Sequence, residues 1–479
     1  MAHMDIDIYG NKYNSLEDIP EGAIFDELSL SSMDFTELPE KLATLTVNNL
    51  YLLYCSDLTS LKGLPKGLKR LNCRGANITS LKGLPKGLEK FDCSSTNITS
   101  LEGLPEGLKK LDCSNANITS LKGLPKGLEK LDCWECSRLD SLEGLPEGLK
   151  ELDCSDANIT SLEGIREGLK ELDCSNCKKI TSLKGLPEGL EKLDCRNCYE
   201  LTSLEGLPEG LEILVCSHTH ITSLKGLPES LKMLDCSNTH ITSLEGLPEG
   251  LEKLSCYCCE KLTSLEGLPE ELKELDCSHM HITSLKGLPK GLEKLVCGDC
   301  HELTSLKGLP QGLKELTCKL SSKLTSLKGL PEELEVLDCN HTFITSLEGL
   351  PKKLKVLNCS CSDITSLEGL PKGLKKLDCH NCKSLTSLKG CPEGLKELKC
   401  YNNCYSLTSL EGVPKSVELI ECYNCDNLKY IPDYIPDNVI EGLSPKKIAE
   451  CKANWKKEQE RKKTSEQQRA AITKRFMGR

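Results

Sequence analysis

The chain has 479 residues, a net charge of −11 and 31 cysteines, and only 4% of its residues are aromatic. Twelve Lys or Arg against four Glu give residues 444–479 a local charge of +8, so the preceding residues carry −19. This acidity argues against nucleic-acid binding by the main body of the chain, because such surfaces are normally basic. No run of 18 apolar residues occurs, so no membrane span is expected.

One phrase recurs along most of the chain, for example LKELDCSDANITSLEGIREG at residues 149–168. Nineteen cysteines mark it, from Cys55 to Cys422, at intervals of 18 to 22 residues. A period of this length with leucines at fixed offsets predicts a solenoid, in which each repeat buries its apolar edge against its neighbours. Thin cores of this kind need few aromatic residues. One unbroken array is therefore expected in place of several globular domains.

The cysteines are expected to be reduced thiols that behave as small hydrophobic residues. Their number is odd, the chain is long, and no apolar signal segment opens it. We therefore expect a cytoplasmic, reducing location, which includes delivery into a host cytosol. Residues 1–3 are interpreted as a cloning scar, with the natural start at Met4.

The chain is expected to begin with residues 4–30 as an N-terminal cap and a first irregular repeat. Leu30 stands there where later repeats have Cys, and Ile6 and Ile8 can form a strand before it. The regular array then covers residues 31–426. Alternation in each repeat predicts a short strand: Leu152 and Cys154 point inward, while Asp153 faces solvent.

The return segment of each repeat, T-S-L-x-G-L-P-x-G-L, contains Pro and Gly, which disfavour a regular helix. An extended or polyproline-like convex side is therefore expected. The fold class that follows is an α/β-type solenoid, mostly β. It has one long parallel sheet on the concave face, with strands about 4.8 Å apart, and a short C-terminal helix.

Residues 427–457 are expected to form the last irregular repeat and a capping helix. Ser444 and Pro445 suit the N-cap and first helical position. Ile448, Cys451 and Trp455 give one apolar stripe that would seal the last sheet edge. Residues 458–479 are basic and polar and are expected to be a flexible tail that contacts an acidic partner or the acidic solenoid itself.

The pattern L-x-x-L-x-(V/C)…L-x-x-L-x-x-L-P-x-x-L resembles the short, 20–21-residue class of bacterial leucine-rich repeats. That class occurs in the recognition domains of type III-secreted effectors, and similar arrays occur in proteins of amoeba-associated bacteria and large viruses. Here Cys replaces the inward Val or Leu of the family. The ubiquitin-ligase members add a catalytic domain of a few hundred residues, whereas only about 36 residues follow the repeats here. The resemblance implies a binding module and not a ligase.

Paired cysteines raise the alternative of a metal site. Cys174 and Cys177, and then Cys195 and Cys198, form two C-x-x-C pairs separated by seventeen residues, a spacing typical of zinc or another soft metal. The second Cys, however, occurs where the repeat has an extra turn residue. A thiol that follows turn length is explained by filling the turn, so a cofactor-free protein is the favoured interpretation, with the metal site left open.

An acidic column is predicted on the outward face of six successive strands. Like charges at this spacing repel, and lysines two positions upstream can offset them. A solvated, charge-laced sheet, a basic partner and a row of calcium ions are the three interpretations. The column comprises Asp92, Asp112, Asp132, Asp153, Asp173 and Asp194.

Apolar and aromatic residues interrupt this polar face and are candidate partner-binding residues, since exposed groups of this kind mark hot spots. Drift between repeats would produce the same substitutions without a function. The candidates are Ile213, Val215, Met233, Val296, Val336, Val356, Trp134, Tyr257, Tyr401 and Tyr423.

No nucleophile–base pair or phosphate loop stands outside the repeat, so no enzyme is predicted. The sequence predicts a non-catalytic scaffold that binds a protein partner on its concave sheet, with a host-directed effector as the specific form. A thiol-rich metal or redox protein and a passive structural repeat protein are the alternatives.

Overall fold

The computed structural model describes residues 6–8, 11–13, 16–401 and 406–477. They form two compact units: the first runs to Ile241 and includes Glu245–Leu251, and the second comprises Thr242–Leu244 and the residues from Glu252 onward. The predicted scar at residues 1–3 lies outside the described residues. No described helix is both long enough and apolar enough to cross a bilayer.

The first unit begins with an antiparallel pair, β1 (Ile6–Ile8) and β2 (Asn11–Tyr13), so the strand expected around Ile6 and Ile8 is present. Two 3₁₀ helices, Leu16–Asp18 and Glu40–Thr44, flank the first strand of the sheet. The parallel sheet of this unit consists of β3 (Ile24–Ser29), β4 (Thr46–Tyr51), β5 (Arg70–Asn72), β6 (Lys90–Asp92), β7 (Lys110–Asp112), β8 (Lys130–Asp132), β9 (Glu151–Asp153), β10 (Glu171–Asp173), β11 (Lys192–Asp194), β12 (Ile213–Val215) and β13 (Met233–Asp235).

The second unit continues the same repeat and ends in a 3₁₀ helix, Asp437–Val439, and one α-helix, α1 (Pro445–Met477). Its parallel strands are β14 (Lys253–Ser255), β15 (Glu274–Asp276), β16 (Lys294–Val296), β17 (Glu315–Thr317), β18 (Val336–Asp338), β19 (Val356–Asn358), β20 (Lys376–Asp378), β21 (Glu397–Lys399), β22 (Leu419–Glu421) and β23 (Ile440–Glu441).

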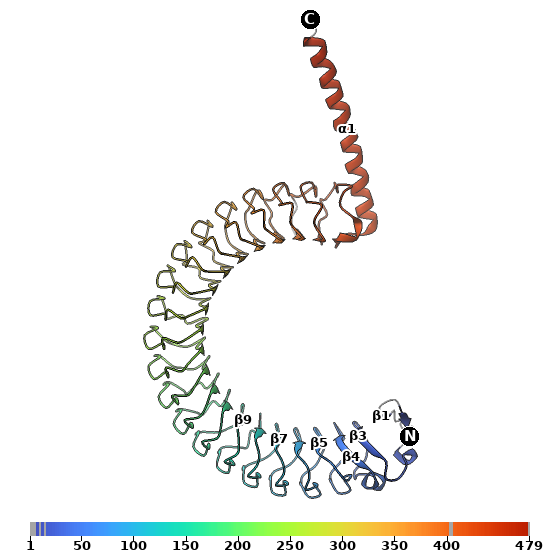
Figure 1. Cartoon of the computed structure of the whole chain (residues 1–479), viewed down its shortest axis with the longest axis vertical. Helices are drawn as coiled ribbons and strands as arrows, with labels where there is room; N and C mark the ends of the chain where they lie inside the picture. Colours follow the sequence, from blue (N-terminus) through green and yellow to red (C-terminus); the bar gives the residue numbers. More distant parts are fainter. Residues whose placement is uncertain (1–5, 9–10, 14–15, 402–405, 478–479) are drawn as a thin grey trace. The chain divides into compact units, whose positions relative to one another are not determined.

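Neighbouring strands within each unit pair in parallel and in register, so equivalent residues of successive repeats lie side by side. On β8 and β9, for example, Leu131 pairs with Leu152 and Asp132 with Asp153. In the three-residue strands of the sheets, the central residue, usually leucine, and the cysteine that follows the strand are buried, as Leu131 and Cys133 illustrate at 0% exposure. The strands line the inner side of each unit and the return segments its outer side (Figure 1). The predicted parallel solenoid is thereby confirmed in both units.

The outer side of the repeats consists of turns and extended segments, as the Pro–Gly pattern predicts. Each Pro begins a tight turn, as at Pro125, whose carbonyl accepts the Leu128 N–H at 3.1 Å. Gly123 has φ of +97°, and a Cβ atom there would lie 2.9 Å from the carbonyl oxygen of Leu101 in the preceding repeat. Glycine at this position therefore permits both the backbone angle and the close stacking of repeats.

The C-terminal helix differs from the sequence prediction in length. Its start is as predicted, because the Ser444 hydroxyl accepts the Lys447 N–H and Ile448 and Cys451 are buried. A short helix followed by a flexible tail from residue 458 was expected, but α1 continues to Met477, 33 residues in all (Figure 1). The expectation was wrong because the polar segment is rich in Lys, Glu, Gln, Arg and Ala, which favour helix, and lacks Gly and Pro up to Met477.

Candidate interaction surface

The inner face of each sheet is built from the first and third residues of every strand, because the second residue is buried. The predicted partner-binding residues all lie on this face or in the turn that directly follows it, but they divide between the two units. Trp134, Ile213, Val215 and Met233 belong to the first unit. Tyr257, Val296, Val336, Val356, Tyr401 and Tyr423 belong to the second unit.

A shallow groove of about 480 Å³ crosses the face of β8–β13 in the first unit. Ile213 on β12 pairs in register with Met233 on β13, and Met233 is 38% exposed. Val215, at the other end of β12, lines the same groove. The charged lining residues are five carboxylates, Glu151, Asp153, Glu171, Asp173 and Asp194, and three cations, Lys130, Lys192 and Arg196. The groove therefore combines an apolar end with a net negative wall.

Trp134 is not part of this groove. It follows β8, is 41% exposed, and its Nε1–H donates to Oδ2 of Asp156 at 3.2 Å. A second hollow of about 290 Å³ lies on the face of β5–β8 and is lined by alternating basic and acidic side chains, among them Lys110 and Asp112. This second hollow lacks the exposed apolar group that distinguishes the groove over β8–β13.

The aspartates of the acidic column also close turns, a role that was not predicted from the sequence. Oδ1 of Asp153 accepts the Ser155 backbone N–H at 3.0 Å and the Ser155 hydroxyl at 2.5 Å, and Asp92 and Asp112 hold Ser94 and Ser114 in the same way. Each carboxylate thus closes the turn that leaves its strand, as short side chains with an oxygen acceptor do. The recurring D-C-S triplet was the available signal.

Burial raises the pKa of Asp112 and Asp153, and the neighbouring aspartates of the column add to the effect. The hydrogen bonds from Ser114 and Ser155 act in the opposite direction and are outweighed. At these two positions, negative charge is therefore held at a cost in free energy, which an approaching cation would relieve.

Lysine–glutamate pairs connect successive repeats beside the column. Lys130 Nζ lies 2.6 Å from Glu151 Oε2, and Lys170 Nζ lies 2.7 Å from Glu191 Oε1. All four side chains are about half exposed, so each pair contributes little to stability. These pairs fix the pattern of charge along the face more than they stabilise the fold.

The regularly spaced cysteines form a buried ladder of hydrogen-bonded thiols. The Sγ of Cys113 donates to the carbonyl oxygen of Asp132 in the next repeat at 3.4 Å, and Cys133 donates to that of Asp153 at 3.2 Å. The same carbonyl groups accept the backbone N–H groups of these two cysteines. Val or Leu, the residue of the related repeats, could not make this second bond, which gives a physical reason for Cys.

The second cysteines of the C-x-x-C pairs occupy the turn. Cys177 Sγ donates to the Cys154 carbonyl at 3.2 Å, and Cys198 Sγ donates to the Cys174 carbonyl at 3.3 Å. Shorter repeats place Thr in this slot, as at Thr219, whose hydroxyl donates to Cys216 of its own repeat at 2.7 Å. The thiol therefore donates to a carbonyl of the preceding repeat, whereas the Thr hydroxyl donates to a carbonyl of its own repeat.

The described cysteines are all free. A hydrogen bond from Cys198 and burial raise the pKa of Cys174, and burial raises that of Cys195. Both groups therefore favour the thiol form. Within the described ranges, no group of three or more His, Cys, Asp and Glu side chains is placed to hold a metal ion.

In the second unit, the predicted residues form two separate clusters, one of valines and one of tyrosines. Val336 on β18 and Val356 on β19 pair in register and form a small apolar patch. Tyr401 and Tyr423 lie edge to face with ring centroids 6.0 Å apart. His380, which the sequence analysis did not single out, stacks on Tyr401 at 4.5 Å with an interplanar angle of 3°. His380, Tyr401 and Tyr423, named here the aromatic row, take the same position in three successive repeats. Aligning the repeats would have revealed His380.

The chain resembles solved structures of repeat proteins. YopM from Yersinia enterocolitica WA-314 matches with a TM-score of 0.57 and 27% identity, over 87% of this chain and 90% of that chain. CroV588, described as a novel circular leucine-rich-repeat protein, matches with a TM-score of 0.56 and 18% identity, over 86% of this chain and 76% of that one. The second likeness concerns the fold alone. No protein-family model matches the chain, and no curated protein sequence does.

A strand, a buried cysteine, a turn residue with positive φ and a Pro–Gly return segment recur through both units. The structural match to YopM extends over 87% of the chain. The chain has the leucine-rich-repeat fold, with repeats that fit the short bacterial class.

Proposed function

We propose that this protein is a non-catalytic scaffold that binds another protein on the inner face of its sheets. The observation that carries the proposal is the groove over β8–β13, where Ile213, Val215 and Met233 interrupt an otherwise charged face. Exposure of apolar side chains to water is unfavourable, so a partner that covers them lowers the free energy of the system. A fold whose face is built for extended contact suits this role.

The charges of the groove indicate the kind of partner. Five carboxylates and three cations leave its wall negative, and burial raises the pKa of Asp153 among them. A partner segment with Lys or Arg next to an apolar side chain would meet the carboxylates of β9–β11 and cover Ile213 and Met233 together. Electrostatic complementarity of this type sets orientation and association rate, while the apolar contact supplies most of the affinity.

Two further parts of the proposal concern location and a second contact. Free, buried thiols throughout the described repeats suit a reducing compartment, and we propose a cytoplasmic location, reached in a host cell if the protein is an effector. The basic tail is proposed as a second contact for an acidic partner, and its residues 461–470 on α1 are exposed. A metal or redox protein and a passive structural repeat remain the alternatives.

The proposal is tested by affinity capture from a host-cell lysate with three forms of the protein. Ile213→Asp places a charge at the apolar end of the groove and should abolish capture of the partner. Ile24→Asp changes an equally apolar residue that is 77% exposed on β3, outside the groove, and should capture as the wild type does. Recovery of the same proteins by wild type and Ile213→Asp would exclude the groove. If no protein distinguishes the wild type from empty beads, the passive alternative is favoured.

A further inference from the structure

One cysteine of the second unit differs from the buried ladder. Cys361 occupies the turn after β19 and is only half buried, with φ of 55°. Its backbone N–H is bonded to the His380 carbonyl at 2.9 Å, which places it against the corresponding turn of the next repeat. Cys361 is therefore held beside His380 of the aromatic row.

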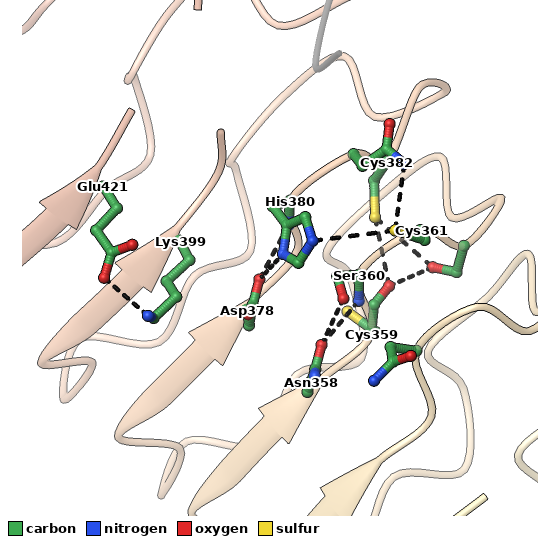
Figure 2. A network of polar contacts seen from close by, with 12 residues as sticks. Asn358, Cys359, Ser360, Cys361, Asp378, His380, Cys382, Lys399 and Glu421 are labelled. Carbon is green, nitrogen blue, oxygen red and sulfur yellow. Dashed lines mark hydrogen bonds and ion pairs between the residues drawn. The ribbon is translucent and has the colours of Figure 1, made fainter. Parts of the chain in front are cut away.

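A histidine and an aspartate stand in line with this thiol. His380 Nδ1 lies 2.7 Å from Asp378 Oδ1, and His380 Nε2 lies 4.0 Å from Cys361 Sγ (Figure 2). A carboxylate can only accept, so the proton of the neutral imidazole must sit on Nδ1. The lone pair of Nε2 is then directed to the side on which Cys361 lies, which makes His380 a base for the thiol.

Two neighbours fix this arrangement. The Tyr401 ring stacks on the imidazole at 4.5 Å and limits its rotation. The Asn381 amide donates from Nδ2 to Cys361 Sγ at 3.2 Å, an interaction that becomes stronger when the sulfur is negative. The base and the hydrogen-bond donor thus reach one sulfur atom from the next repeat, and the carboxylate of that same repeat orients the base.

Cys258 supplies the comparison within the same unit. It occupies the same turn position, with φ of 57°, and is also half buried. Burial and the nearby Glu260 raise the pKa of Cys258. The third half-buried thiol of the described chain, Cys391, has its pKa raised to about 12 by burial. Partial exposure is therefore not enough by itself to favour the thiolate form of Cys258 or Cys391.

We propose that Cys361 is a nucleophilic modification site, activated by His380 and Asp378, that exchanges with low-molecular-weight disulfides. The Cys361 thiol gives its proton to His380 Nε2, and the thiolate attacks one sulfur of the small disulfide. A new bond forms between Cys361 Sγ and that sulfur as the original S–S bond breaks. The leaving thiolate takes the proton from His380. Cys361 is oxidised to a mixed disulfide, and half of the small disulfide is reduced to a thiol.

The site is independent of the protein partner proposed above, so it is tested on the purified full chain. Reduced protein is exposed to oxidised glutathione, quenched with acid, and digested, and the modified fraction of each cysteine is followed by mass spectrometry. Cys361 should form the mixed disulfide about tenfold faster than Cys258, because His380 Nε2 is placed to take the proton of its thiol as the sulfur attacks. Equal rates at the two cysteines would overturn the proposal.

The role of the histidine is tested by His380→Ser, since Ser360 occupies the equivalent position of the preceding repeat and the fold accepts it there. The rate at Cys361 should fall to that of Cys258, while the rate at Cys258 stays unchanged and serves as the control for folding. Asp378→Asn should give a smaller loss. Asn358 takes that place in the preceding repeat, where its Oδ1 accepts the Ser360 N–H, and the amide oxygen of an Asn at position 378 can still accept from His380 Nδ1. An unchanged rate at Cys361 in His380→Ser would refute activation by His380.

Discussion

The Sγ atom of Cys133 lies 3.2 Å from the carbonyl oxygen of Asp153, and the backbone N–H of Cys133 donates to the same oxygen at 2.8 Å. One residue thus binds the next repeat twice, once through its backbone and once through its side chain. Burial raises the pKa of Cys133 well above its ordinary value, so the proton needed for the second bond stays on the sulfur. Repetition of this contact makes the cysteine ladder part of the stacking of repeats.

The ladder predicts that Cys133→Val destabilises the protein even though Val fills the site. The loss of one weak hydrogen bond and the crowding of an extra carbon should lower the free energy of unfolding by about 1 kcal/mol. Cys133→Ala, which leaves a small cavity, should cost about 1–2 kcal/mol. Urea unfolding followed by circular dichroism measures both. A Cys133→Val protein as stable as the wild type would show that the thiol bond contributes nothing.

The turn-closing role of the acidic column predicts opposite results for two substitutions of Asp153. Asp153→Ala removes the acceptor for the Ser155 N–H and should cost about 1 kcal/mol. Asp153→Asn keeps the acceptor, as Asn358 does for Ser360 at 3.1 Å, and should be neutral or slightly stabilising at pH 7 because it removes a like charge. Equal losses in the two variants would mean that charge, and not hydrogen bonding, explains the column.

The same residue predicts a dependence of stability on pH. Burial raises the pKa of Asp153, so the folded protein binds more protons than the unfolded chain between the ordinary pKa of Asp, about 3.9, and the raised value. The contribution of Asp153 to stability is therefore lost as the pH rises through this window. Asp153→Asn should show a shallower fall in stability over that range than the wild type, in parallel urea titrations. A steeper fall would contradict the direction of the pKa shift.

The close stacking of return segments predicts a large effect at Gly123. Gly123→Ala places a Cβ atom 2.9 Å from the Leu101 carbonyl and forces alanine into positive φ, so about 2–4 kcal/mol of stability should be lost. Gly22 provides the control, because its φ is +73° but nothing lies within 4 Å of an added Cβ atom. Gly22→Ala should cost only about 1 kcal/mol. Similar losses at the two sites would show that strain, and not the contact between repeats, dominates.

The C-terminal helix is predicted to stabilise the second unit only through its first three turns. Cys451 is fully buried and donates to the Leu428 carbonyl at 3.3 Å, and Lys452 pairs with Asp437, whereas residues 461–470 are exposed. Deletion of residues 458–479 should therefore change the thermal midpoint by less than about 2 °C, while Cys451→Asp should lower it clearly. A large loss of stability on deletion would contradict this division of the helix.

The sequence was sufficient to predict the fold, because the period and the inward Leu and Cys of each repeat determine strand, register and core together. It also located the helix start at Ser444. The length of α1 was underestimated because polarity was interpreted as disorder although Lys, Glu, Gln and Arg favour helix. The site at Cys361 could not be predicted, because Asp378 and His380 lie 17 and 19 positions after Cys361 in the sequence. Only the stacking of two repeats brings His380 next to Cys361.

The central claim, that the groove over β8–β13 binds a protein partner, is tested most directly by photo-crosslinking. A benzoyl-phenylalanine replaces Met233 in one protein and Phe343 in the other; Phe343 is 54% exposed in the second unit and does not line the groove. Irradiation in the host-cell lysate should give a discrete adduct of one mass from position 233 and none of that mass from position 343. No discrete adduct at position 233, or the same adduct at both positions, would contradict the account.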